Sequence, residues 1–227
     1  MPAAQRVLIL PELLEIIFMF IQLCHPFTKE ISDTQPRTGK QTHWGHHRIL
    51  RCCALVNKVW YREAGPYLWK QIEEDEDDEK FLFIQDCFST VATPRKQYYA
   101  GFIEQGTVDN WWSDPHPLKD LSFDRLTSLR IWLDQHGQRI PRLKAPRLKR
   151  LEIAPKDPSF SDPMKHCFEG LVDELAKYIP RIYPHLRIVI FAVIMPTPHL
   201  VKRLMKRLPE LKVIHYVPPP ENNDDQD

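Results

Sequence analysis

The chain has 227 residues, a length that suits one domain or two. Hydrophobic residues make up 43% of it and aromatic residues 11%, which is enough for a folded core and argues against a disordered chain. Lys and Arg number 31 and Asp and Glu number 30, so the formal net charge of +1 provides no overall field toward nucleic acid or a membrane surface.

The most informative segment runs from Glu12 to Leu23. Only Glu12, Glu15 and Gln22 are polar in it, so the helix that it predicts is apolar on nearly every side. Pro11 and the two carboxylates argue against a membrane span, and no small-residue cleavage site follows, as a signal peptide requires. We therefore expect one face of this helix to pack within its own domain and the other to be covered by a second protein.

The next segments predict a loop and then further helix. Residues 26–47 hold few apolar side chains and predict a surface insertion. From Arg48 to Trp60, apolar residues recur at spacings of three and four, which predicts a helix with a buried face. Gly65–Pro66 predicts a break. The residues expected on the buried face are Leu50, Cys53, Ala54, Val56 and Trp60.

Three blocks of this region resemble an F-box. They are Leu10–Phe18, Cys53–Trp60 and Ala64–Trp69, and they follow the family's pattern of Leu-Pro before a helix, Val-x-x-x-Trp on a second helix and a final Leu-Trp. The resemblance departs from the family at residues 26–47, where F-boxes have a short turn. It implies a three-helix fold that docks a Skp-family adaptor and, through it, the cullin scaffold of an SCF-type ubiquitin ligase. The residues that the resemblance implies for adaptor binding are Leu10, Pro11, Leu14, Ile17, Val56, Trp60, Leu68 and Trp69.

Physical reasoning also points to a partner for this region. Three short helices in roughly 50 residues cannot bury all of their large apolar side chains. Each side chain left exposed forfeits about 1.5 to 3 kcal/mol of burial. A second interpretation stays open, in which the N-terminal helices pack on the C-terminal half of their own chain and the protein is a non-catalytic interaction scaffold with no ubiquitin role.

Seven consecutive acids follow, from Glu73 to Glu79. Such a run repels itself and is typical of a solvated linker, which we place at residues 73–80. The run lacks the glycine and the alternating ligand order of a calcium loop. The C-terminal residues 218–227 are also acidic and predict a disordered tail.

A repeated apolar pattern begins near residue 120. Asp162–Pro163 and Thr197–Pro198 predict helix starts between its copies, and Pro180 predicts the end of the first of these helices. The second helix has Leu200, Leu204 and Leu208 on one side. Alternating strands and helices imply parallel strands with right-handed crossovers. The pattern, Leu-x-x-Leu-x-Ile or a close variant, occurs at Leu126–Ile131, Leu148–Ile153, Leu186–Phe191 and Leu211–Tyr216.

This half of the chain resembles a leucine-rich-repeat solenoid, whose repeats share a core only by stacking. It departs from that family three residues after each strand, where the usual Asn or Cys is missing, and an ordinary α/β domain with coincidental leucine spacing stays an alternative. The predicted fold class is α/β, with a three-helix F-box at residues 1–72 and a short, irregular leucine-rich-repeat-like α/β solenoid at residues 81–217. The residues at the departing positions are Asp134, Lys156, Ile194 and Pro219.

Candidate catalytic and metal chemistry is weak in this sequence. No catalytic motif is present, so we expect no enzyme activity and no cofactor. His43, His46 and His47 lie near Cys52 and Cys53, but two adjacent cysteines rarely reach one ion, so we predict no metal site. The irregular spacing of the cysteines is typical of a reducing compartment, which indicates the cytoplasm or the nucleus.

Basic residues gather at 139–150 and 202–207. A nucleic-acid site would interleave them with exposed aromatic residues, so we expect neither nucleic acid nor a membrane as a partner. A solvated face and a patch for an acidic or phosphorylated protein segment both account for them.

The two resemblances together imply a substrate-recognition subunit of an SCF-type ubiquitin ligase. The F-box would dock the adaptor, and the repeats would hold a protein substrate so that its lysines lie near the conjugating enzyme at high effective concentration. The outward repeat positions expected to contact the target are Arg130, Trp132, Glu152 and His215.

Overall fold

The computed structural model describes residues 10–24, 46–72, 83–110, 117–133, 142–155, 175, 177–193 and 195–218. The chain divides into two compact units, Met1–Lys70 and Gln71–Asp227. Gln71 and Ile72, which we expected to close the first domain, form the first strand of the second unit. The 73–80 linker, the insertion up to residue 45 and the tail after residue 218 lie outside the described residues.

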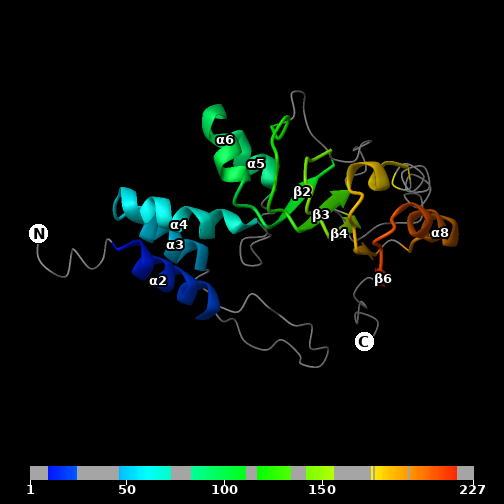
Figure 1. The fold of residues 1–227 in the computed structure, drawn as a ribbon, viewed down its shortest axis with the longest axis horizontal. Helices are drawn as coiled ribbons and strands as arrows, with labels where there is room; N and C mark the ends of the chain where they lie inside the picture. The colour runs from blue at the N-terminus through cyan, green and yellow to red at the C-terminus, as the bar shows by residue number, and fades with distance from the viewer. Residues whose placement is uncertain are drawn as a thin grey trace, which may run out of the picture. The chain divides into compact units, whose positions relative to one another are not determined.

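The described part of the first unit consists of three helices around one small core (Figure 1). The side chains of Leu14, Phe18, Leu50 and Ala64 are fully buried and form the centre of this core. Each helix contributes at least one of them, so the core holds all three helices together. The helices are α2 (Pro11–Cys24), α3 (His46–Ala54) and α4 (Lys58–Lys70).

The predicted continuous helix from Arg48 to Trp60 is wrong, because α3 ends at Ala54 and the chain turns before α4 begins. Asn57 caps the new helix. Its side-chain Oδ1 accepts hydrogen bonds from the N–H groups of Val59 at 2.9 Å and Trp60 at 3.1 Å. An Asn in this position satisfies backbone donors that the first turn of a helix leaves unpaired, which favours a fresh helix start.

The predicted break at Gly65–Pro66 is also wrong, since α4 continues to Lys70. Pro66 removes one hydrogen bond inside the helix. On both sides of it, however, the helix contacts the core: Ala64 is fully buried, and Tyr67 and Leu68 pack against the buried cluster. Tertiary packing here outweighs the local cost of the proline.

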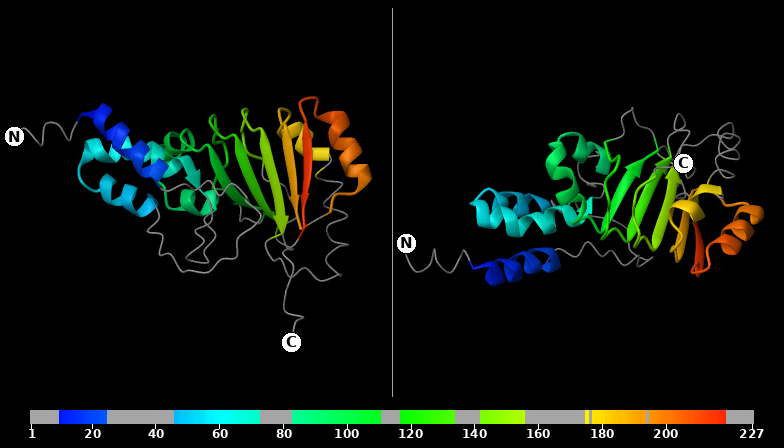
Figure 2. Two further views of the ribbon diagram at one scale, coloured as in Figure 1. Left: turned by 90° about the horizontal axis from the view of Figure 1, so that it is seen from below. Right: turned by 45° about the horizontal axis from the view of Figure 1, so that its top comes forward.

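The described part of the second unit is built on a six-stranded sheet in which all strands are parallel and follow one another in chain order. The prediction of an α/β fold with parallel strands is confirmed. Helices α5 (Ile84–Ser89) and α6 (Thr93–Ala100) separate the first two strands, and α8 (Pro198–Arg207) separates the last two (Figure 2). The strands are β1 (Gln71–Ile72), β2 (Gln105–Asp109), β3 (Ser128–Leu133), β4 (Arg150–Pro155), β5 (Ile188–Ala192) and β6 (Val213–Val217).

The repeated apolar pattern matches the register of the last four strands. Leu129 on β3 pairs with Leu151, which pairs with Val189, and Val189 pairs with Ile214. The first three of these side chains are fully buried, so they form a row across one face, which we call the covered face of the sheet. A second row two residues further on consists of Ile131, Ile153, Phe191 and Tyr216.

A further copy of the pattern, which the sequence did not reveal, lies on β2. Gly106 pairs in register with Leu129, so Ile103, Gly106 and Val108 take the positions of the other repeats. Glycine replaces a large residue there because α5 comes close: a Cβ atom on Gly106 would lie 2.6 Å from Cδ1 and 3.0 Å from Cγ1 of Ile84. The buried Ile84 side chain thus fills the space that a leucine fills elsewhere.

Each repeat also begins earlier than the pattern predicted. A buried residue stands three positions before the first leucine, and in the last three repeats a proline follows it directly. The proline fixes the backbone of the turn that leads into each strand. The buried residues are Phe123, Ala145, Tyr183 and Leu208, and the prolines are Pro146, Pro184 and Pro209.

The backbone repeats in the same way at the start of the strands. The residue directly before each of the strands β2 to β5 offers its carbonyl to the next strand. That carbonyl accepts hydrogen bonds from two successive N–H groups at the start of the next strand, at 2.8–3.2 Å. This shared acceptor fixes where each new strand begins relative to the one before it. The four carbonyls belong to Glu104, Thr127, Lys149 and Arg187.

The start of α8 is confirmed. Thr197 caps it, since its side-chain Oγ1 accepts a hydrogen bond from the N–H of Leu200 at 3.2 Å, and Pro198 follows in the first turn. The leucines expected on one side of the helix, Leu200, Leu204 and Leu208, are all buried.

The predicted helix end at Pro180 is wrong, because the residues from 177 to 182 are helical. The N–H of Tyr183 still donates to the carbonyl of Ile179 at 2.8 Å. Burial of Ile179 and Tyr183 on the same stretch holds the last turn in place beyond the proline. The predicted helix start at Asp162–Pro163 lies outside the described residues.

We predict that Gly106→Val lowers the free energy of unfolding by about 1–3 kcal/mol, because the new side chain must displace Ile84. Gly101→Ala is the control: it caps α6 at a φ of −67°, where alanine fits, so it should be neutral or slightly stabilising. Urea unfolding of the three proteins measures this. Equal stability of Gly106→Val and the wild type would contradict the close packing of α5 on β2.

Candidate protein-interaction surfaces

One side of α2 carries exposed apolar side chains. Leu13, Ile16 and Phe20 recur at spacings of three and four, so they follow one face of the helix. Ile16 is 47% exposed and Phe20 is 57% exposed. Leu10 and Met19 extend this surface, and both are exposed as well. We call these five residues the α2 band; it lies along a helix of three to four turns.

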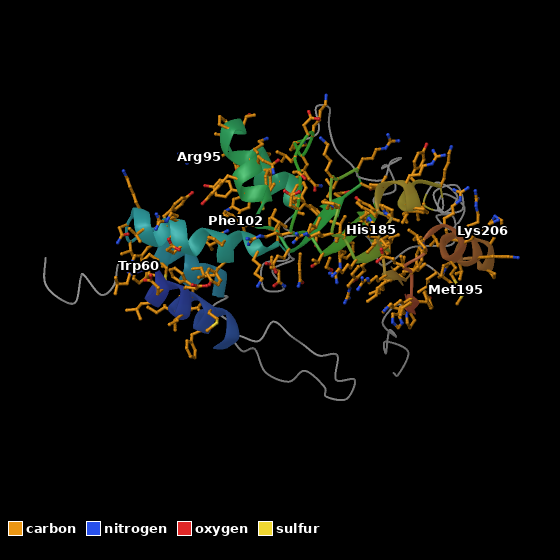
Figure 3. All side chains as sticks on the ribbon, viewed as in Figure 1. Trp60, Arg95, Phe102, His185, Met195 and Lys206 are labelled. Atoms are coloured by element: carbon orange, nitrogen blue, oxygen red, sulfur yellow. The ribbon has the colours of Figure 1, made fainter. Side chains whose placement is uncertain are left out.

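The opposite side of α2 is packed by aromatic rings. The ring of Phe18 lies edge-on to Trp60, with centroids 5.8 Å apart, and tilted against Tyr67, also at 5.8 Å. Trp60 is labelled in Figure 3. The Tyr67 hydroxyl donates to the backbone carbonyl of Glu15 at 3.4 Å. Burial raises the pKa of Tyr67, so the hydroxyl keeps its proton and remains a donor. These contacts orient α2 so that the α2 band faces outward.

The turn between α3 and α4 is a second exposed apolar feature of this unit. Leu55 is 85% exposed and Val56 is also exposed. Two large apolar residues at a turn contribute nothing to the core of their own unit. Such residues are typical of a contact with another protein when they occur together with a larger apolar surface.

The structure divides the predicted adaptor-binding residues into three groups by their exposure. Leu14 is fully buried, so it supports the fold and cannot contact a partner directly in the folded protein. Three other residues, Leu10, Pro11 and Val56, are exposed. The remaining four are half-buried, and they are Ile17, Trp60, Leu68 and Trp69.

Sequence reasoning missed most of the α2 band. The resemblance singled out Leu14 and Ile17, whereas Leu13, Ile16 and Phe20 carry the exposed surface. A helical projection separates the two sets, because positions that differ by one residue are turned by about 100°. The sequence alone did not indicate which of the two sets faces outward, since both are apolar.

The four residues predicted to contact a target all lie on the face of the sheet opposite the covered face, which we call the second face. Arg130 pairs in register with Glu152, and its Nε lies 3.0 Å from the carboxylate Oε1. The Arg130 guanidinium carbon is also 5.9 Å from the centre of the Trp132 ring. Arg150 reaches the same carboxylate at 3.5 Å. The structure thus brings three of the predicted residues together, while His215 lies two strands away on β6.

On β5 and β6 the second face is largely apolar apart from His215. Ile190 stands in register between Glu152 and His215 and is almost fully buried. Ile188 and Val213 pair with each other one row below and are half-buried. The second face therefore changes from charged on β3 and β4 to apolar on β5 and β6.

The turns that lead into β5 and β6 are joined by an ion pair between neighbouring repeats. Glu210 lies 2.9 Å from Nδ1 of His185 and 3.3 Å from Nε of Arg187. The pKa of the Glu210 carboxyl lies below its ordinary value. The hydrogen bond from His185 is the largest cause, and the hydrogen bond from Arg187 is the second. This carboxylate is exposed, so solvent screens much of its attraction to both partners.

Metal and nucleophile chemistry finds no support in the described part of the chain. The side chains of His43, His46 and His47 lie outside the described residues. Among the residues that the structure describes, no three His, Cys, Asp or Glu side chains gather as a metal site. Burial, and then the charge of Cys52, raises the pKa of the Cys53 thiol, which makes it a poor nucleophile.

Comparisons of the chain with protein-family models, with curated proteins and with solved structures give no match. Within the described residues, no helix has both the length and the apolar character needed to cross a membrane.

We predict that Leu14→Ala destabilises the first unit by about 2–5 kcal/mol, because it opens a cavity in the core. Phe20→Ala removes the most exposed side chain of the α2 band and should change stability by less, about 1 kcal/mol or under. Amide hydrogen exchange in α3 and α4 of the full chain distinguishes the two. Equal exchange rates in both variants would mean that α2 is rotated from the orientation described above.

We predict that Glu210→Gln slightly lowers the free energy of unfolding near neutral pH, and that this difference from the wild type becomes smaller as the pH falls. The folded-state pKa lies below the unfolded-state value of about 4.3, so the carboxylate stabilises the fold fully above that value. This contribution is lost as the pH falls through the folded-state pKa. Urea midpoints of both proteins across this range provide the measurement, and a gap that stays constant with pH would contradict the assigned hydrogen bonds.

Proposed function

We propose that this protein is a substrate-recognition subunit of an SCF-type ubiquitin ligase, with an F-box in its first unit and a leucine-rich-repeat-like solenoid in its second. The exposed α2 band is the observation that carries this proposal. It lies on a three-helix unit whose sequence blocks resemble an F-box, and it gives that unit an apolar surface in need of a partner. In the F-box family, that partner is a Skp-family adaptor.

The energetics of the α2 band support a lasting complex. Full burial of a large apolar side chain is worth about 1.5–3 kcal/mol, and the residues of the α2 band, which are 37–57% exposed, would each gain roughly half of that when a partner covers them. Several such side chains on one helix face fit the helix-in-groove mode of recognition, in which anchors recur at spacings of three and four. Glu12 and Glu15 on the same helix would remain in water at the rim of such an interface.

The mechanism in this proposal is tethering. The first unit docks the adaptor and hence the cullin scaffold, and the sheet unit holds a protein substrate. A substrate lysine held near the charged conjugating enzyme reacts at a raised effective concentration. The chain itself supplies no catalytic group in this scheme.

The second face of the sheet supports the substrate-binding half of the proposal. Side chains at alternate positions of adjacent parallel strands form an array in which charged and apolar residues lie side by side. Arg130 and Arg150 provide directional polar contacts, and Ile188 and Val213 provide apolar area. An extended surface of this kind is how stacked repeats bind other proteins.

We predict that Ile16→Asp or Phe20→Asp reduces co-purification with a Skp-family adaptor by about tenfold or more, because a charge would be buried in the contact. Met205→Asp is the matched control, since it places the same charge at an exposed apolar position on α8 and should leave adaptor binding unchanged. Both positions in α2 are exposed, so the fold should survive, which circular dichroism checks.

Two results would count against the proposal. Wild-type protein that fails to bind any Skp-family adaptor would remove the F-box role. Loss of folding in Ile16→Asp and Phe20→Asp, without any adaptor binding by the wild type, would favour the alternative of an interaction scaffold whose N-terminal helices pack on its own repeats.

A further inference from the structure

Three cationic side chains are aligned across the starts of β4, β5 and β6. Lys149, Arg187 and Lys212 each stand directly before their strand, in the same position of three successive repeats. Their backbones are bonded in series: the N–H of Arg187 donates to the carbonyl of Lys149 at 2.8 Å, and the N–H of Lys212 donates to that of Arg187, also at 2.8 Å. All three residues are exposed. We call them the cation row.

The cation row concentrates positive charge. Neighbouring strands are about 4.8 Å apart, so Lys149 and Lys212 start about 10 Å from each other with Arg187 between them. Like charges that face each other on adjacent strands destabilise a sheet. The nearest acid, Glu210, pairs with Arg187 and with His185. Within the described residues, Lys149 and Lys212 make no ion pair.

The surroundings of the cation row are also basic. The turn from Arg142 to Lys149 contains no acid, and it adds Arg142, Lys144 and Arg147 to the same end of the sheet. Arg150 follows Lys149 directly and shares the carboxylate of Glu152 with Arg130. Positive charge therefore exceeds negative charge at the starts of β4, β5 and β6, although the whole chain has a formal net charge of only +1.

We propose that the cation row is a docking site for an acidic, extended segment of a target protein. This inference rests on the proposed function and names the chemistry of the segment that the second unit would hold. A polyproline II segment has three residues per turn and advances about 3.1 Å per residue, so acids three residues apart lie on one side of it and span about the distance from Lys149 to Lys212. The site fits a segment with acids at that interval or in an unbroken run.

A protein segment fits this site better than a nucleic acid. Single-stranded nucleic acid is held by exposed aromatic side chains that stack on the bases, in addition to cations. In the turns that carry the cation row, residues 145–150, 183–188 and 208–213, the one Phe, Tyr or Trp is Tyr183, and it is buried. Tyr178 lies beside Arg142, but it is half-buried, and its ring is already contacted by Arg142 at 5.2 Å and by Lys177 at 5.3 Å. The aliphatic parts of the Lys149, Arg187 and Lys212 side chains can instead pack against a peptide while their charged ends bind its acids.

The test measures the affinity of the full-length protein for a labelled peptide that has aspartate at every third position and leucine at the positions between. The same peptide with asparagine in place of each aspartate is the comparison. Lys149→Gln combined with Lys212→Gln should weaken binding of the aspartate peptide about tenfold. Lys202→Gln combined with Lys206→Gln is the matched control: it removes the same charge from two exposed positions of α8, of which Figure 3 labels Lys206, and should leave binding unchanged. Glu210→Gln removes the acid of the cation row and should strengthen binding about twofold.

Several outcomes would overturn the proposal. These are equal loss of binding in the two double variants, equal affinity for the aspartate and asparagine peptides, or tighter binding of an oligodeoxythymidine or of phosphatidylserine vesicles with the same dependence on Lys149 and Lys212. Adaptor co-purification is measured separately on the same proteins. Loss of the adaptor with intact peptide binding would refute only the proposed function, and the reverse result would refute only the role of the cation row.

Discussion

The second unit depends on one constraint, the register between neighbouring parallel strands. Leu151 faces the core because it stands level with Leu129, and a slip of one residue would bring Arg150 or Glu152 into the core instead. The shared backbone acceptors at the strand starts fix the same register independently of the side chains. Everything on the surface follows from it, including the position of Arg130 beside Glu152 and the alignment of the cation row.

Much of this sheet could be predicted from the sequence. The spacing of Leu148, Leu151 and Ile153, repeated in other segments, reports which side chains point to one face, and that information alone predicts how the strands pair. The copy on β2 could not be predicted, because the glycine at position 106 reflects the approach of Ile84 from another element. The start of α4 at Asn57 and its passage through Pro66 were missed because capping and tertiary packing outweighed the apolar periodicity.

The candidate surfaces were predicted less well than the fold. The sequence of α2 indicates an unusually apolar helix, but it has no polar side from which to infer an orientation. The orientation depends on rings that reach it from α4, since Trp60 and Tyr67 enclose Phe18 and leave Phe20 outside. The cation row was predicted only in part: Lys149 belongs to the basic run at 139–150, but Arg187 and Lys212 are far from it in the sequence, and only the register brings the three together.

The chain-order arrangement of the sheet has a consequence for how such a protein changes over evolutionary time. Each strand pairs only with the strands nearest to it in the sequence, so a longer connection leaves the pairing of all others intact. This explains how connections as unequal as those before β4 and β5 coexist in one sheet. Duplication of a segment would lengthen the array, and deletion would shorten it, without redesign of what remains. Such a scaffold allows the length of the binding surface to change by whole repeats while the packing of the interior stays the same.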